Sequence, residues 1–267
     1  MSARRLLGDL AAPDVAAALH ERSIVVVPIG AVEQHGPHLP LATDTIVVEA
    51  YAEALAGQVG ERLDLWFLPP LAISKSNEHA WAPGTVWLGP ETVLAILRDI
   101  GRSLRMLPTR KVVFLNGHGG NTSLLDVACR ELRLHDGLQT FLVHPFLPAD
   151  HGGAGDPAEH GMGIHGGVSE TSLLLHLRPE LVHLDRAAPA LPVVLDGFRH
   201  LRFGGPVGFG WLSDDLHPSG VIGDPTLASA ERGAAEFAAG LQFLVEAFEE
   251  IARFSFVIPS EQPDARH

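Results

Sequence analysis

A short segment near the N-terminus carries acidic and histidine side chains whose spacing suits a divalent metal ion. In the run EQHGPHLPLATD, Glu33 and His35 are separated by one residue, so in extended backbone their side chains point the same way. Asp44 closes the run, where a helix is expected to begin. Carboxylate oxygens and imidazole nitrogens suit Zn, Mn or similar ions, and one carboxylate can bridge two metals. Alternatively, Asp44 is a helix N-cap and the other residues, with His38, only shape the loop.

A glycine-rich loop with a central histidine follows a later predicted strand. Its sequence is NGHGGN, in which Gly119 and Gly120 would let a ligand approach the backbone closely. A phosphate-binding loop is the alternative, because helix N-termini attract anions. The Lys and Ser/Thr pair of the usual nucleotide-binding loop does not follow it. His118 is therefore predicted to be a metal ligand.

A third run, HGGVSE, ends a long loop and enters a predicted helix. It places His165 and Glu170, another histidine and carboxylate, near a helix N-terminus. The helix dipole would favour Glu170 there even in a purely structural role. The chain holds 15 histidines, many beside Gly, Pro, Asp or Glu, and this enrichment favours metal or acid–base chemistry.

Composition narrows the class of protein. With 46% hydrophobic and 19% charged residues, the chain is a well-filled globular protein. Its formal net charge of −13 repels nucleic acid and anionic lipid, so neither is an expected partner. No apolar stretch reaches ~18 residues, and the start of the chain lacks the apolar run of a signal peptide. Cys129 is the single cysteine and fits a buried helix position, so a cytoplasmic protein without an internal disulfide is expected.

Strand-like and helix-like segments alternate along the chain. The predicted strands are short apolar or β-branched runs at 24–29, 65–71, 111–115 and 140–144. The predicted helices cover 13–22, 44–59, 91–107, 121–134, 170–177 and 225–254, the last with Asp224 as N-cap. This order predicts an α/β fold with helices on both faces of a parallel or mostly parallel sheet. No repeat or linker divides residues 1–267, so one domain is expected, with a frayed tail at 258–267.

The predicted sheet explains how these distant residues could form one site. In open α/β sheets, ligands bind at the carboxyl ends of the strands. The loops after the first three strands carry the Glu33 cluster, His79 and His118, respectively. Substrate contacts are expected from the same loops, with these candidates: Asn77, His79, Trp81, Gly119 and Gly120.

Four sequence blocks resemble the signature blocks of the creatininase (creatinine amidohydrolase) family. They are PIGAVEQHGPHLPLATDT, NGHGGN, HGGVSETS and GVIGDPT, and the similarity spans roughly residues 24–245. The resemblance implies a three-layer αβα sandwich, a dinuclear metal site and, often, a hexameric assembly. It therefore implies two divalent ions and a homo-oligomer. The mixed oxygen and nitrogen donors suit Zn²⁺ and/or Mn²⁺, and they also permit Fe²⁺.

The resemblance also implies roles for individual residues. It assigns the metal ligands, with Asp44 bridging, as Glu33, His35, Asp44, His118 and Glu170. His165 matches the histidine that acts on the substrate. Two departures stand out. Gly120 replaces a glutamate that binds metal in creatininase, and no tryptophan lies between Trp87 and Trp211, where creatininase places tryptophans over its substrate. The missing tryptophans count against creatinine itself as the substrate.

These observations predict a hydrolase acting on the C–N bond of a cyclic amide or related small-molecule amide. Metal-activated water is expected to attack the carbonyl, and His165 to protonate the leaving nitrogen or, alternatively, only to orient Glu170. A peptidase or a formamide deformylase on the same metal platform is the enzymatic alternative. A metal-binding scaffold without activity is the non-enzymatic one.

Overall fold

The computed structural model describes residues 5–147 and 149–256 of the chain. Its sheet contains β1 (Ile24–Ile29), β2 (Leu65–Phe67), β3 (Lys111–Asn116) and β4 (Gln139–Val143). The strands run parallel in the order β2-β1-β3-β4, with Ile24 opposite both Leu65 and Lys111. Every residue of β1 and β3 is buried, which accounts for the apolar run IVVVPI in β1 and the run VVFL inside β3. The predicted frayed tail at 258–267 lies outside the described residues.

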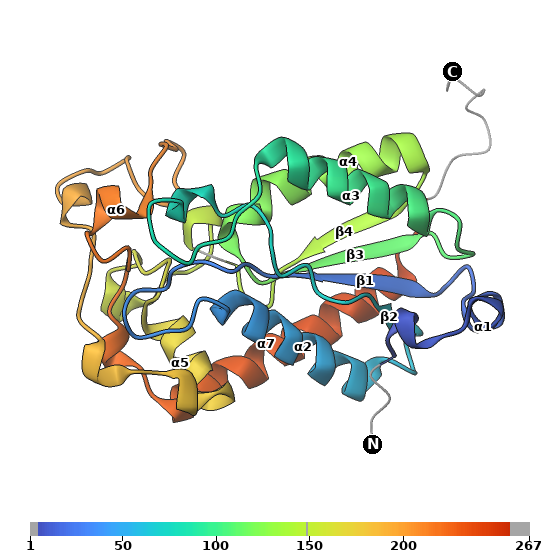
Figure 1. Ribbon diagram of the computed structural model, residues 1–267, viewed down its shortest axis with the longest axis horizontal. Coiled ribbons are helices and arrows are strands. Elements are labelled where there is room, and N and C mark those ends of the chain that lie inside the picture. The colour runs from blue at the N-terminus through green and yellow to red at the C-terminus, as the bar shows by residue number, and fades with distance from the viewer. Residues whose placement is uncertain (1–4, 148, 257–267) are drawn as a thin grey trace.

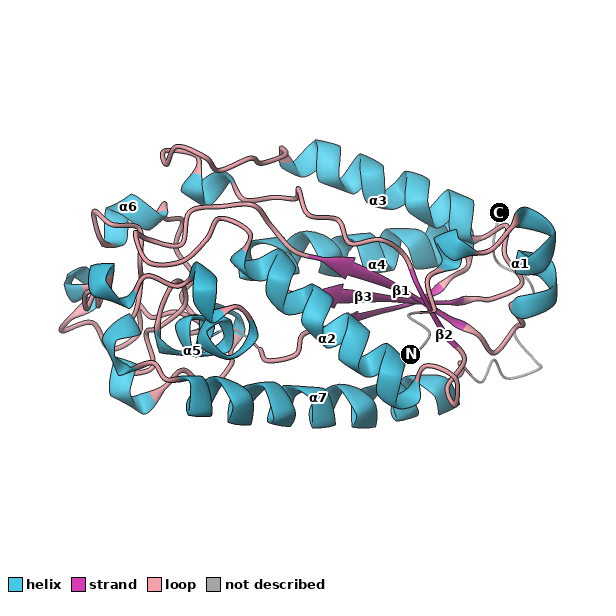
Figure 2. Ribbon diagram, turned by 60° about the horizontal axis from the view of Figure 1, so that its bottom comes forward, coloured by secondary structure: helices cyan, strands magenta, loops and turns pink. Residues whose placement is uncertain are grey.

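Helices cover both faces of this sheet (Figures 1 and 2). On one face lie α3 (Pro90–Leu104) and α4 (Thr122–Asp136), packed on residues such as Val25 and Phe114. The opposite face packs residues such as Val26 and Leu115 against three helices: α2 (Thr43–Val59), α5 (Val168–Leu177) and α7 (Ala230–Arg253). The predicted α/β fold with three αβα layers is therefore confirmed.

The two remaining α-helices of the described residues lie at opposite ends of the molecule. The short helix α1 (Ala12–Ala18) lies beyond the amino ends of the strands (Figure 1). At the carboxyl ends the chain forms a large cluster of loops that includes α6 (Ser213–Leu216). Within the described part of the chain, no helix combines the length and the apolar character needed to cross a membrane.

Several predicted element boundaries were wrong for local reasons. The second strand ends at Phe67 instead of residue 71, because Pro69 and Pro70 lack backbone N–H groups for a ladder. Asp224 does not open the last helix: its side chain accepts a hydrogen bond from the Thr226 N–H (3.0 Å) and closes a separate turn. The helix α7 instead begins at Ala230, where Ser229 is the N-cap.

Candidate metal centre

Asp44 lies between two histidines that come from different loops. It is in the first turn of α2 and is 3% exposed. Its Oδ1 is 3.2 Å from His35 Nε2, and its Oδ2 is 3.2 Å from His118 Nδ1. The alternative that Asp44 is the N-cap is wrong, because Ala42 occupies that position and has no side-chain capping bond. One carboxylate with an oxygen toward each histidine is the arrangement that a bridging metal ligand needs.

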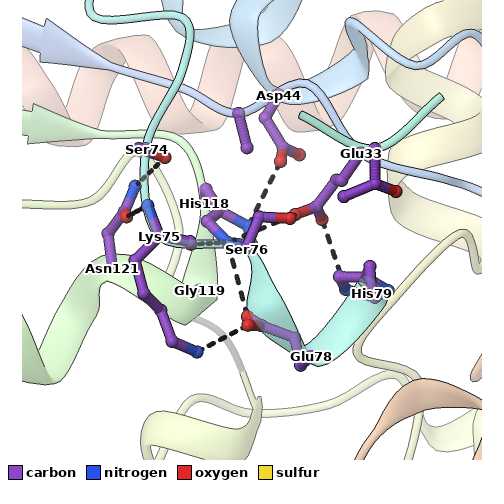
Figure 3. Close-up of polar contacts among 12 residues, drawn as sticks. Glu33, Asp44, Ser74, Lys75, Ser76, Glu78, His79, His118, Gly119 and Asn121 are labelled. Carbon is purple, nitrogen blue, oxygen red and sulfur yellow. Dashed lines mark hydrogen bonds and ion pairs between the residues drawn. The ribbon is translucent and has the colours of Figure 1, made fainter. Parts of the chain in front are cut away.

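Glu33 brings a second carboxylate to the same place. Its side chain is fully buried, and its Oε2 accepts a hydrogen bond from Ser76 Oγ and lies 3.3 Å from His118 Nε2. Its Oε1 lies 3.4 Å from His79 Nε2 and 3.6 Å from His165 Nδ1. Figure 3 shows Glu33 between Asp44, Ser76 and His79.

Two carboxylate oxygens in this cluster lack hydrogen-bond partners among the described residues: Glu33 Oε1 and Asp44 Oδ2. A buried acceptor without a partner costs roughly 1–3 kcal/mol, and more when it is charged. A cation would remove that cost for both oxygens. The donor set of carboxylate oxygens and imidazole nitrogens therefore fits divalent metal ions such as Zn²⁺ or Mn²⁺.

Glu170 and His165 approach from α5 and the loop before it. Glu170 accepts a hydrogen bond from the Gly166 N–H (2.5 Å), which directs its Oε2 to within 3.8 Å of His35 Nε2. The His165 ring lies against the His35 and His79 rings, with centroids 4.2 and 4.1 Å away. Donor atoms within 4.8 Å of one another form three groups: Glu33–His35–Asp44, His35–His165–Glu170 and Glu33–His79–His165. The structure thus brings together the residues that the sequence predicted as ligands.

The electrostatics of the cluster favour bound positive charge. Burial raises the pKa of Glu33 to about 8 and that of Glu170 to about 7. Burial alone would lower the pKa of His35, but Asp44, Glu170 and Glu33 outweigh it and raise that pKa to about 10. Without a metal ion, protons are therefore held here above their usual pH range, where divalent cations would compete with them.

Three residues that the sequence did not predict contact the histidines of the cluster, and Figure 3 shows two of them, Lys75 and Glu78. Lys75 accepts a hydrogen bond at its backbone oxygen from His118 Nε2 (2.9 Å). Glu78 places Oε1 3.5 Å from the same nitrogen. Gln34 donates from its side-chain amide to His79 Nδ1 (2.9 Å). The sequence signal for Lys75 and Glu78 was their place in the polar loop after β2, because ligands bind at the carboxyl ends of the strands in such sheets.

A cavity of about 750 Å³ opens onto the cluster. Of the predicted substrate contacts, it is lined by His79, Gly119 and Gly120, together with His118, His165 and Glu170. Asn77 and Trp81 are not among the residues that line it. The Trp81 indole instead donates a hydrogen bond to Ser213 Oγ (2.7 Å) and is 39% exposed. Trp211 does line the cavity.

His38 lies apart from the metal-binding groups. Its Nε2 is 3.0 Å from Thr171 Oγ1, so it joins the loop after β1 to α5. This contact matches the alternative in which His38 shapes the loop.

Comparison with known proteins identifies the family. The sequence profile of the creatininase family, described as creatinine amidohydrolase, matches residues 8–248. This chain belongs to the creatininase family. It is 37% identical over 240 residues to a mycofactocin precursor peptide peptidase of Mycobacterium ulcerans (strain Agy99), covering 86% of this chain and 85% of that protein. It is 35% identical over 188 residues to the creatinine amidohydrolase of Pseudomonas putida, covering 63% of this chain and 70% of that protein.

Solved structures support the same assignment. The crystal structure of creatinine amidohydrolase (creatininase) matches with a TM-score of 0.71 and 26% identity, covering 94% of this chain and 99% of that one. The predicted family, its fold and the prediction of a hydrolase that acts on C–N bonds are therefore confirmed. The substrate of this creatininase-family member is a separate question.

Proposed function

We propose that this creatininase-family hydrolase is metal-dependent and cleaves an amide bond in a short peptide. Its two divalent ions would be held by the predicted ligands Glu33, His35, Asp44, His118 and Glu170. The observation that carries the proposal is the Asp44 carboxylate, whose two oxygens each lie 3.2 Å from a different histidine. When bound, such ions supply Lewis acidity and lower the pKa of water toward neutrality. Similar structures described as Zn–Zn type and as Mn creatininase support Zn²⁺ and Mn²⁺ as candidate metals.

His165 is the residue that would move a proton. Its Nε2–H donates to the Gln34 backbone oxygen (2.6 Å), which leaves Nδ1 directed at the cluster, 3.6 Å from Glu33 Oε1. Burial lowers the pKa of His165 well below its usual range, so the ring is neutral and Nδ1 carries a lone pair. His165 would therefore take a proton from the attacking water at Nδ1 and deliver it to the leaving nitrogen. The alternative is that His165 only orients the ligands around it.

The cavity supports a peptide as the substrate class. Its volume of about 750 Å³ lies in the range that pockets for drug-sized ligands usually have, roughly 300–1,000 Å³. Apolar side chains also line the cavity, among them Phe146, Phe209 and Trp211. The relative of 37% identity named as a precursor peptide peptidase covers more of the chain than the creatinine amidohydrolase does.

A small cyclic amide is the second candidate. It is favoured by the 35% identity to a creatinine amidohydrolase and by the match to a mutant creatininase complexed with creatine, with a TM-score of 0.72. The two candidates differ in how much of the cavity the substrate would fill.

A substrate screen of the metal-loaded chain tests the proposal. Short peptides, creatinine, hydantoins, lactams and formamides would be incubated with the protein, and products identified by mass spectrometry. Peptide cleavage that stops on chelation supports the proposal, whereas turnover of cyclic amides alone establishes the second candidate. If two ions bind and every substrate survives, both substrate candidates are overturned.

A further inference from the structure

Gly120 and Glu78 occupy complementary space beside His118. A Cβ atom at position 120 would lie 1.9 Å from Glu78 Oε1 and 2.4 Å from His118 Nε2. Both separations are far below van der Waals contact. The carboxylate of Glu78 therefore fills the space that any side chain at position 120 would need, and the two positions depend on one another.

Several contacts fix the Glu78 side chain in this position. It is 7% exposed, and its Oε2 forms a 2.5 Å ion pair with Lys75 Nζ, three residues earlier. Its Oε1 lies 3.5 Å from His118 Nε2 (Figure 3). The backbone of the same segment is attached to the β3 loop, because the Lys75 N–H donates to Asn121 Oδ1 (3.2 Å).

The charge of Glu78 distinguishes it from the other carboxylates of the cluster. Lys75 supplies a cation beside it, so the pair contributes no net charge. The unpartnered oxygens that call for metal belong to Glu33 and Asp44. Glu78 Oε1 adds a further acceptor on the Nε2 side of His118, where the Lys75 backbone oxygen lies at 2.9 Å and Glu33 Oε2 at 3.3 Å. The Nδ1 atom of the same ring faces Asp44 Oδ2 at 3.2 Å.

We infer that Glu78 is a positioning residue of the metal centre, which acts through His118. With the Lys75 backbone oxygen it holds the Nε2–H of His118, so that Nδ1 stays directed at the ion beside Asp44. An acceptor behind a metal-binding histidine fixes its tautomer and ring orientation and raises its basicity as a ligand. The NGHGGN motif itself supplies no carboxylate beside His118, because position 120 is glycine. This inference rests on the proposed metal dependence.

Variants at Glu78 test the inference through metal binding. Zn²⁺ or Mn²⁺ would be titrated calorimetrically into the metal-free full chain, and Co²⁺ absorption would report the ligand geometry. Glu78→Ala should raise the Kd of one ion by roughly tenfold to a hundredfold, the usual effect of removing such a partner, and leave the other ion unchanged. Glu78→Gln keeps an acceptor oxygen and should restore part of the affinity.

Asp99→Asn is the matched control. Asp99 forms an ion pair of the same i, i+3 spacing with Arg102, but on the exposed surface of α3. Loss of this ion pair should leave both Kd values and the Co²⁺ spectrum unchanged. Lys75→Met provides a further variant, because it removes the cation that holds Glu78 and should weaken the same ion.

The outcomes separate this inference from the proposed function. If wild type binds two ions and both Kd values and the Co²⁺ spectrum of Glu78→Ala match wild type within twofold, Glu78 has no positioning role, although the proposed function stands. If wild type binds fewer than two ions, the proposed function fails and this inference fails with it. Should Glu78→Ala not fold, as judged by its thermal transition, Glu78→Gln and Lys75→Met decide the question by the same criterion.

Discussion

Asp44→Ala should remove both metal ions, because the two oxygens of this carboxylate face different histidines. Oδ1 lies 3.2 Å from His35 Nε2 and Oδ2 lies 3.2 Å from His118 Nδ1. If Asp44 were a ligand of one ion only, its removal would leave the second ion bound. The number of ions lost therefore distinguishes a bridging carboxylate from a terminal one.

The size of the effect follows from linkage between binding and folding. At a free metal concentration 100 times Kd, each ion stabilises the folded chain by about 2.7 kcal/mol. Two ions at Asp44 would contribute about 5.4 kcal/mol together. For chains near this length, 1 kcal/mol shifts Tm by roughly 2–4 °C. Chelation should therefore lower the Tm of wild type by about 10–20 °C, and that of Asp44→Ala by almost nothing.

Thermal scans with and without chelator, together with elemental analysis, would measure both quantities. Asp44→Asn is a second variant that keeps the buried volume of the side chain. Glu91→Ala is the control, because Glu91 occupies the same second position of its helix, α3, but is exposed. An Asp44 variant that keeps two ions and the full chelator shift would refute the bridging role. A shift of about half the wild-type value would restrict Asp44 to one ion.

Three further changes have defined expectations. His165→Ala should keep both ions and lower kcat by roughly 10²–10⁴-fold; an unchanged kcat would reduce His165 to an orienting role. Between pH 7 and 9 the metal-free chain should lose stability. In the folded chain the pKa values of Glu33 (about 8) and His35 (about 10) lie above their values in the unfolded chain. The folded state therefore binds more protons than the unfolded state over this window, and its free energy of unfolding falls as the pH rises. A urea midpoint that increases over this window would contradict that sign. Gly120→Ala should displace the Glu78 carboxylate and weaken one ion, and metal titration showing wild-type affinity would exclude the collision.

The fold was largely predictable because burial leaves a direct mark on composition. The run IVVVPI is apolar at every position, and in the structure it is β1, buried on both faces in the middle of the sheet. A parallel sheet then brings the loops after β1, β2 and β3 to one edge. From that rule and the residue chemistry, Glu33, Asp44 and His118 are predicted to lie together. In the structure, both carboxylates lie within 3.3 Å of a His118 ring nitrogen.

The supporting residues were not predictable in the same way. The role inferred for Glu78 depends on its side chain filling the space beside Gly120. That space forms only when two loops packed against each other bring together residues 42 positions apart in the sequence. Trp81 lies in the predicted loop, but its indole bonds to Ser213 instead of lining the cavity. Side-chain direction in a loop depends on such tertiary partners, which the local sequence does not encode.

Anomalous diffraction from crystals of the metal-loaded chain would locate the bound ions. With Zn²⁺ or Mn²⁺ bound, we expect two anomalous peaks per chain, one on each side of the Asp44 carboxylate. One peak should lie beside His35 Nε2 and the other beside His118 Nδ1, the two atoms that Asp44 approaches at 3.2 Å. A single peak, or peaks that do not contact Asp44, would show that Asp44 does not bridge two metal ions.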